Sequence, residues 1–153
     1  MLVYARPEMD KENLSIHFEI HDSDVVCIKN CRRDNVDSDG VWIRLYKTME
    51  DEAPYRQFCI MPADQAGRAE WASIKECAKQ IHFAKPYTDY DFKECEIHSE
   101  IFEDRYTIDA KFTLKSLGLE DAKEVIMDLR VVNMDEDDWS KFYDTGKIRY
   151  SVG

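Results

Sequence analysis

The sequence predicts a mainly β protein: an antiparallel β-sandwich of about eight strands with one or two short helices. Apolar residues alternate with polar ones along several short segments, turn-forming pairs separate these segments, and helical patterns do not alternate with them. Such a succession favours a sandwich or barrel over a parallel α/β sheet. The 153 residues suffice for one hydrophobic core, so residues 1–153 are expected to form a single domain.

The expected strands have a period of two, which gives each strand one apolar face. In the first of them, Leu14, Ile16, Phe18 and Ile20 share a face while polar residues fill the other. Trp42 alternates away from the apolar side of its strand, so it belongs either to a second core layer or to a ligand platform. The eight expected strands are Leu14–Ile20, Val25–Lys29, Val41–Tyr46, Tyr55–Met61, Phe92–His98, Tyr106–Phe112, Val125–Val132 and Lys147–Val152. Their turns are indicated by Asp39-Gly40, Glu103-Asp104 and Thr145-Gly146.

One longer segment has helical spacing instead. Within Asp64–Gln80 and just beyond it, apolar residues recur every three or four positions, which predicts a helix packed across one edge of the sheets. A shorter helical turn is expected at Leu114–Leu117, because Gly118 is able to take the left-handed conformation that ends a helix.

The acidic composition argues against two classes of partner. The chain has 32 Asp and Glu residues against 21 Lys and Arg, a formal net charge of −11. This charge repels nucleic-acid phosphates and anionic lipids, and no basic stripe offsets it. The chain also lacks a stretch of 18 apolar residues that would span a membrane. Neither nucleic acid nor a membrane is expected as a partner, and the sequence leaves the oligomeric state open.

The cysteines and the N-terminus bear on the cellular compartment. Five cysteines cannot all pair within one chain, and their spacing does not match a zinc-binding frame. The first residues lack the basic and apolar segments of a signal peptide. These features predict a cytoplasmic protein with free thiols. The alternative is a secreted protein whose signal peptide was removed.

The sequence contains no motif typical of catalysis. It has no GxSxG elbow, no glycine-rich phosphate loop and no HExxH. His17 and His21 share one face of a strand but lie about 13 Å apart along it, so they cannot bind one metal ion by themselves. We therefore expect neither an enzyme nor a cofactor.

Two acidic segments are weak candidates for binding structural calcium. In residues 35–40, Asp37 and Asp39 supply oxygen atoms at alternate positions, but the twelfth position, which needs a bidentate carboxylate, is a tyrosine. A hairpin turn is the preferred interpretation of this segment. Asp135 and Asp137 belong to a second acidic cluster, for which a solvated run of charges is preferred over a calcium site.

Trp139 lies in the acidic, polar segment DEDDWSKFYDTG, where a core position is less natural for a large ring. An aromatic ring in a polar loop suits sugar binding, because the C–H face of a pyranose stacks on the ring while neighbouring polar side chains bind the hydroxyls. The alternative is a tryptophan that folds back over the end of the sandwich.

Five segments follow one another along the chain: LSIHFEIHDSDV, RRDNVDSDGVWIRLY, YRQFCIMP, DRYTIDAKFTLKSLGLED and VIMDLRVVNMDEDDW. The order of these motifs resembles that of the family 9 carbohydrate-binding modules and their wider DOMON-like relatives. The resemblance covers nearly the whole chain. It implies a β-sandwich that binds sugar ends between two tryptophans with the help of charged and amide side chains, often with structural calcium.

The resemblance also implies which residues would contact the sugar. Trp139 matches the C-terminal tryptophan of the family and Asn133 matches the asparagine of its Val-Asn element. The first tryptophan of the family has no counterpart here. We hypothesise that Trp42 replaces it, and that Arg44 or Arg56 replaces the arginine expected where this chain has a cysteine.

The sequence thus predicts a non-catalytic carbohydrate-binding module that recognises sugars through aromatic stacking. The alternative is a β-sandwich that has lost its sugar contacts and acts as a structural or protein-interaction domain. The two hypotheses differ in whether Trp42 and Trp139 face each other across an open cleft.

Overall fold

The computed structural model describes residues 2–22, 30–32, 35–37, 39–60, 62, 94–133 and 141–151, which form 11 strands and no helix. Accordingly, none of the described segments is a helix able to cross a membrane. The strands are β1 (Leu2–Met9), β2 (Asn13–His21), β3 (Asn30–Arg32), β4 (Asn35–Asp37), β5 (Gly40–Tyr46), β6 (Arg56–Ile60), β7 (Cys95–Ile101), β8 (Tyr106–Thr113), β9 (Glu124–Asn133), β10 (Lys141–Asp144) and β11 (Ile148–Ser151).

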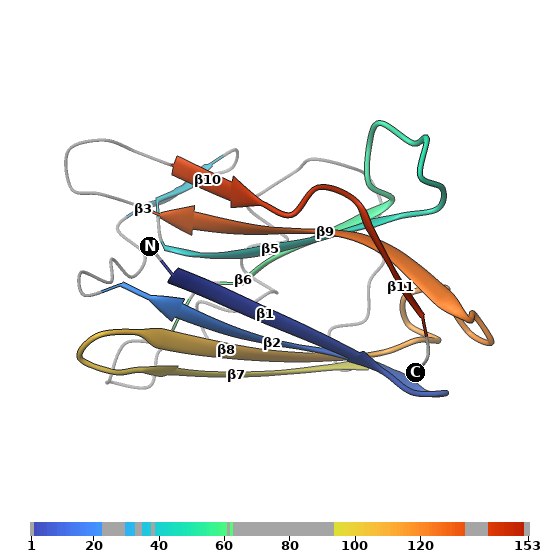
Figure 1. The fold of residues 1–153 in the computed structure, drawn as a ribbon, viewed down its shortest axis with the longest axis horizontal. Coiled ribbons are helices and arrows are strands. Elements are labelled where there is room, and N and C mark those ends of the chain that lie inside the picture. Colours follow the sequence, from blue (N-terminus) through green and yellow to red (C-terminus); the bar gives the residue numbers. More distant parts are fainter. Residues whose placement is uncertain are drawn as a thin grey trace.

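Two antiparallel sheets lie one above the other (Figure 1). The four-stranded sheet has the order β1-β2-β8-β7, and the five-stranded sheet has the order β10-β9-β5-β6 with β11 also paired to β9. Strands β3 and β4 form a separate two-stranded ladder. The prediction of a mainly β, antiparallel sandwich is confirmed.

The apolar faces predicted from the alternation meet between the two sheets. The four apolar residues of β2, Leu14, Ile16, Phe18 and Ile20, are at most 1% exposed. Across the sandwich, Phe58 of β6 and Phe112 of β8 place their ring centroids 4.7 Å apart. Full burial of one such side chain contributes roughly 1.5–3 kcal/mol to folding, so these faces hold the sheets together.

Strand β1 is absent from the strands that the sequence predicts. Its sequence, LVYARPEM, contains Pro7, and most of its side chains are exposed or half-buried. The sheet pairs β1 with β2 on one side only, so β1 is an edge strand. An edge strand tolerates proline and needs no regular apolar face, which explains why alternation does not reveal it.

Residues 35–40 also differ from the expected hairpin turn. Asn35–Asp37 is strand β4, paired with β3, and β5 begins at Gly40. The prediction was wrong because a strand of three residues is too short to show a period of two, so its turn-forming composition dominated. The expected strand Val25–Lys29 and the expected helix Asp64–Gln80 lie outside the described residues.

The expected turns around the four-stranded sheet are confirmed. Glu103 and Asp104 form the tip of the β7–β8 hairpin, and the backbone N–H of Phe102 donates to the carbonyl oxygen of Arg105 at 2.8 Å. After β8, the N–H of Leu119 donates to the carbonyl oxygen of Leu114 at 2.8 Å, which closes a short turn. Leu114 and Leu117 are buried, so this turn closes one end of the core.

Gly118 ends that turn with a φ of +69°, in the left-handed region that disfavours a Cβ. We expect Gly118→Ala to lower the free energy of unfolding by about 1 kcal/mol, measured by urea unfolding. The loss comes from the backbone, because a Cβ here would meet only the Lys47 Nζ atom at 3.8 Å. Gly118→Asn is the matched control, since asparagine tolerates this conformation. Equal stability of the alanine and wild-type chains would contradict this explanation.

Candidate functional site

The outer face of the five-stranded sheet carries Trp42 and Arg44, two of the residues predicted for a sugar site. Both lie on β5, whose alternate residues face the core. Trp42 is half-buried and lies opposite Arg130 of β9. Two residues further along β5, Arg44 lies between Asp128 of β9 and Gln57 of β6. The pairing of the strands therefore collects a ring and four polar side chains on one face.

A polar network of Gln57, Arg44, Asp128, Arg130 and Asp144 crosses this face. Arg44 donates from Nε to Gln57 Oε1 at 3.0 Å and from Nη1 to Asp128 Oδ2 at 3.4 Å. Arg130 donates from Nε to Asp144 Oδ2 at 2.8 Å, and the same nitrogen lies 3.8 Å from Asp128 Oδ2. The network joins β6, β5, β9 and β10, which fixes the charged groups relative to Trp42.

The two carboxyl groups of the network have opposite pKa shifts. Burial, and next the hydrogen bond to Asp144 with the negative charge of that group, raise the pKa of Asp128 to about 6, while Arg130 and Arg44 oppose the rise. The pKa of Asp144 is lowered, chiefly by its hydrogen bond with Asp128 and also by Arg130. Near neutral pH, Asp144 is therefore the fixed negative charge, and Asp128 is poised to take up a proton.

The network has a buried part and an accessible part. Gln57 and Asp128 are 3% and 4% exposed, and Asp128 Oδ1 has no hydrogen-bond partner within the described part of the chain. The side chains of Arg130 and Asp144 are 27% and 32% exposed. The accessible groups are thus a guanidinium donor and a carboxylate acceptor close to a half-buried indole. This combination is suited to a hydroxyl-rich ligand with an apolar face.

The other predicted contact residues do not lie together with Trp42. Arg56 lies opposite Leu45, a core residue, so alternation turns it away from Trp42. Asn133 follows buried Val131 by two positions and shares its side of β9. Successive residues of a strand point to opposite faces of the sheet, so an offset of one position decides whether a side chain lies beside Trp42 or on the core side. The resemblance in sequence did not show on which of the two faces Arg56 and Asn133 lie. Trp139 lies outside the described residues, so its role stays a prediction.

Sequence reasoning missed Gln57, Asp128, Arg130 and Asp144 as members of the site. For two of them a signal was present: Asp128 and Arg130 interrupt the apolar run of β9 at alternate positions, on the same face. Charged residues on one side of an otherwise apolar strand indicate either a solvated face or a polar site. Only the pairing with β5 shows that they lie beside Trp42 and Arg44.

The structure describes two of the four weak calcium candidates, Asp37 and Asp39. Asp39 is 1% exposed and directly precedes β5, while Asp37 is the last residue of β4. Asp135 and Asp137 lie outside the described residues. Within the described ranges, no group of three or more His, Cys, Asp or Glu side chains is placed to hold a metal ion. Structural calcium therefore stays a prediction.

Comparison with known proteins shows that this chain is similar to solved structures of other proteins. No protein-family model matches the chain, and neither does any of the curated proteins. A family 9 carbohydrate-binding module from Caldicellulosiruptor kristjanssonii in complex with cellotriose matches with a TM-score of 0.56 and 14% identity, over 96% of this chain and 64% of that one. A structure of a family 9 module from the same organism in complex with glucose matches with a TM-score of 0.54 and 13% identity, over 97% and 67%.

The chain spans only about two thirds of the length of these structures, 64% and 67%. At 13–14% identity the likeness concerns the fold, and it agrees with the resemblance that the motif order indicates. The wider DOMON-like relationship stays a prediction. The chain adopts a fold similar to that of the family 9 carbohydrate-binding modules.

Proposed function

We propose that the chain is a non-catalytic carbohydrate-binding module whose ligand lies on the outer face of the five-stranded sheet. The observation that carries the proposal is the position of Trp42 beside the polar network, in register across the strands. The sugar stacks on the indole of Trp42, and its hydroxyls bind Arg130 and Asp144. The similar modules were solved with cellotriose and glucose, which makes β-glucans the first ligands to test.

The carboxyl pair supports binding rather than hydrolysis. Arg130 Nε lies 2.8 Å from Asp144 Oδ2 and 3.8 Å from Asp128 Oδ2, and Arg44 Nη1 lies 3.4 Å from the same Asp128 oxygen. Retaining glycosidases hold their two carboxyl groups about 5–5.5 Å apart and inverting ones hold them farther apart, to leave room for the sugar and water. Here both carboxyl groups are engaged by arginines in a fixed network, and Asp128 is only 4% exposed, which leaves it poorly placed to reach a sugar and a water molecule.

Intrinsic tryptophan fluorescence tests the proposal. We expect glucose, cellotriose and related oligosaccharides to shift the emission with a dissociation constant between micromolar and millimolar, roughly −4 to −8 kcal/mol. Trp42→Ala is expected to weaken binding by about tenfold or more, whereas Trp42→Phe keeps a ring and most of the affinity. Trp139→Ala tests the second predicted ring in the same way.

Arg44 and Arg56 form a matched pair of controls for the face that binds. Arg44→Lys alters the network beside Trp42 and is expected to weaken binding, whereas Arg56→Lys alters the other side of the sheet and leaves it unchanged. A wild-type chain that binds none of the sugars would contradict the proposal, as would a Trp42→Ala chain with wild-type affinity. Either result favours the alternative of a structural or protein-interaction domain.

A further inference from the structure

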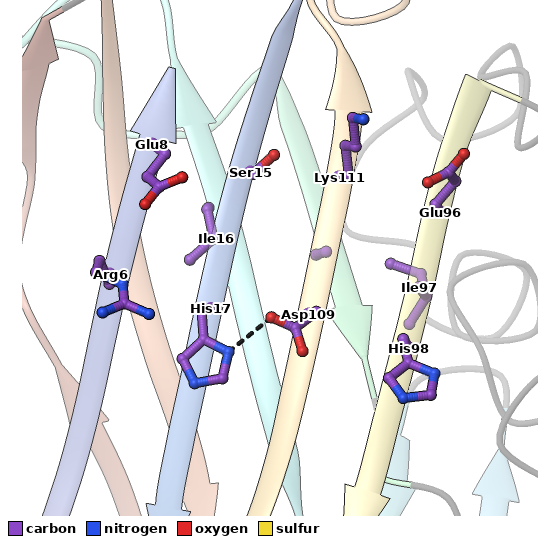
Figure 2. A pocket seen from close by; sticks show the side chains of 11 residues that line it. Arg6, Glu8, Ser15, Ile16, His17, Glu96, Ile97, His98, Asp109 and Lys111 are labelled. Carbon is purple, nitrogen blue, oxygen red and sulfur yellow. Dashed lines mark hydrogen bonds and ion pairs between the residues drawn. The ribbon is translucent and has the colours of Figure 1, made fainter. Parts of the chain in front are cut away.

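The outer face of the four-stranded sheet is hollowed on the side of the molecule opposite Trp42. A hollow of about 380 Å³ lies over β1, β2, β8 and β7. Figure 2 shows its centre, where Arg6, His17, Asp109 and His98 form one row across these strands. The hydrophobic core separates this row from the polar network of the five-stranded sheet.

The row is held in place and yet open to solvent. His17 Nδ1 lies 2.6 Å from Asp109 Oδ1, and Figure 2 shows this contact at the middle of the hollow. His98 Nε2 lies 3.2 Å from Glu100 Oε1. When Nδ1 of His17 donates to Asp109, its Nε2 is left for another partner. Asp109 and His98 have 52% and 71% of their side-chain surface exposed, so a ligand can reach both.

Groups of both signs surround the row. The neighbouring row contains Glu8, Ser15, Lys111 and Glu96, which pair across the same four strands. Acidic and basic side chains therefore alternate over the hollow, and Ser15 adds a hydroxyl. Such a surface offers hydrogen-bond donors and acceptors in nearly equal measure and has no field of one sign. It suits neither a polyanion nor an apolar ligand.

An exposed aromatic ring lies next to the hollow. Tyr4 of β1 is 52% exposed, and its ring meets His21 edge to face, with the centroids 6.0 Å apart and the planes at 75°. A second hollow, lined by Tyr4, also has Arg6 and His17 in its lining, so the two hollows adjoin at these residues. About half of the Tyr4 side chain is therefore exposed to water beside the polar hollow. Tyr4 belongs to an edge strand, and packing of the core does not require a large ring at this exposed position.

We propose that this face is a second carbohydrate-binding groove, which takes a neutral oligosaccharide with one sugar ring on Tyr4 and the following units over the row of Arg6, His17, Asp109 and His98. A pyranose has an apolar C–H face for the tyrosine and hydroxyls that both donate and accept hydrogen bonds. Charged side chains form the stronger hydrogen bonds to such hydroxyls, and the lining supplies both cationic donors and carboxylate acceptors for them. The groove requires neither Trp42 nor the polar network.

Amide chemical-shift mapping of the ¹⁵N-labelled full chain separates this groove from the site of the proposed function. Neutral trisaccharides of glucose, xylose and mannose are titrated to about 10 mM, the range of weak sugar sites, with a trisaccharide of galacturonate as the charged probe. We expect one of the neutral sugars to shift amides of β1, β2 and β8 around Tyr4, His17 and Asp109. Shifts around Trp42 and Arg130 report on the other face.

Substitutions on each face then assign the shifts. Tyr4→Ala and His17→Ala are expected to weaken the binding at the four-stranded sheet by about tenfold or more and to leave shifts around Trp42 unchanged. Leu2→Ala, at an equally exposed position of β1, is the matched control and keeps wild-type affinity. Trp42→Ala is expected to weaken the binding around Trp42 and to leave the binding at the four-stranded sheet unchanged.

The groove is refuted if no neutral sugar shifts the amides around His17, if only galacturonate does so, or if Tyr4→Ala and His17→Ala both leave the affinity unchanged. Absence of shifts around Trp42 alone refutes the proposed function and leaves the groove standing. Both variants alter exposed or half-buried side chains, and the unchanged shifts on the far face show that each one folds.

Discussion

Replacing Phe112 with alanine is expected to lower the free energy of unfolding by about 3–5 kcal/mol, a large fraction of the stability of a domain of this size. Phe112 is fully buried on β8, between Leu14 of β2 and Cys95 of β7. Its ring centroid lies 4.7 Å from that of Phe58, which belongs to the other sheet. The substitution therefore removes buried area and leaves a cavity at the contact between the two layers, where rigid strands relax only partly.

Urea unfolding of the Phe112→Ala chain, followed by circular dichroism, measures the loss. Phe102→Ala is the matched control, because Phe102 is 38% exposed beside the β7–β8 hairpin and its ring contacts the Arg105 guanidinium at 4.5 Å. We expect the control to lose about 1 kcal/mol or less. Similar losses in both chains would show that the Phe58–Phe112 contact does not hold the sheets together.

The second large effect is a dependence of stability on pH that Asp128 produces. The pKa of this carboxyl is about 6 in the folded chain, against 3.8 for an ordinary aspartate. The folded chain thus binds this proton more tightly than the unfolded chain, and the resulting stability is fully present below about pH 4. It is lost as the pH rises through 6, and its size is on the order of 3 kcal/mol.

Asp144 does not cancel this change in the same pH window. Its pKa is lowered, so the stability that it contributes is present above its ordinary pKa of 3.8 and is lost only at lower pH. Between about pH 4 and pH 7, the carboxyl pair therefore changes the stability through Asp128.

Asp128→Asn isolates the effect, because the amide keeps the shape of the carboxyl and does not titrate. Urea unfolding at several pH values is expected to show that wild type loses stability relative to the variant between about pH 4 and pH 7. All other titratable groups are common to both chains, so the difference between the two curves reports Asp128. A midpoint near 6 for the Asp128 carboxyl carbon in a nuclear magnetic resonance titration is the direct check. Parallel stability curves would contradict the assignment.

The alternation of apolar residues along the chain is enough to predict most of the fold. The strand around Phe18 and the strand around Ile108 show a clear period of two, because each has one face in the core and one in water. Edge and very short strands lack that contrast. For this reason the sequence did not reveal β1, with its proline, or the short strands β3, β4 and β10.

The candidate site was predicted only in part. Trp42 and Arg44 were hypothesised to replace contacts of the family, and they share a face because they are two positions apart on one strand. Asn133 was assigned to the same site by the resemblance, and Arg56 was hypothesised as a replacement for the family's arginine. The alternation from Val131 and the pairing with Leu45 place both on the other side of the sheet. Spacing along one strand carries no information about which residue of another strand lies opposite.

By itself, then, the sequence determined the fold class, the core and the acidic character, because burial and charge act on each residue locally. The tertiary structure alone decided which distant residues meet. Register places Asp128 and Arg130 beside Trp42 on one sheet, and aligns Arg6, His17 and Asp109 on the other. Each of these groupings joins strands that are far apart in the chain, and the pairing of those strands depends on the packing of the whole sandwich rather than on any local pattern.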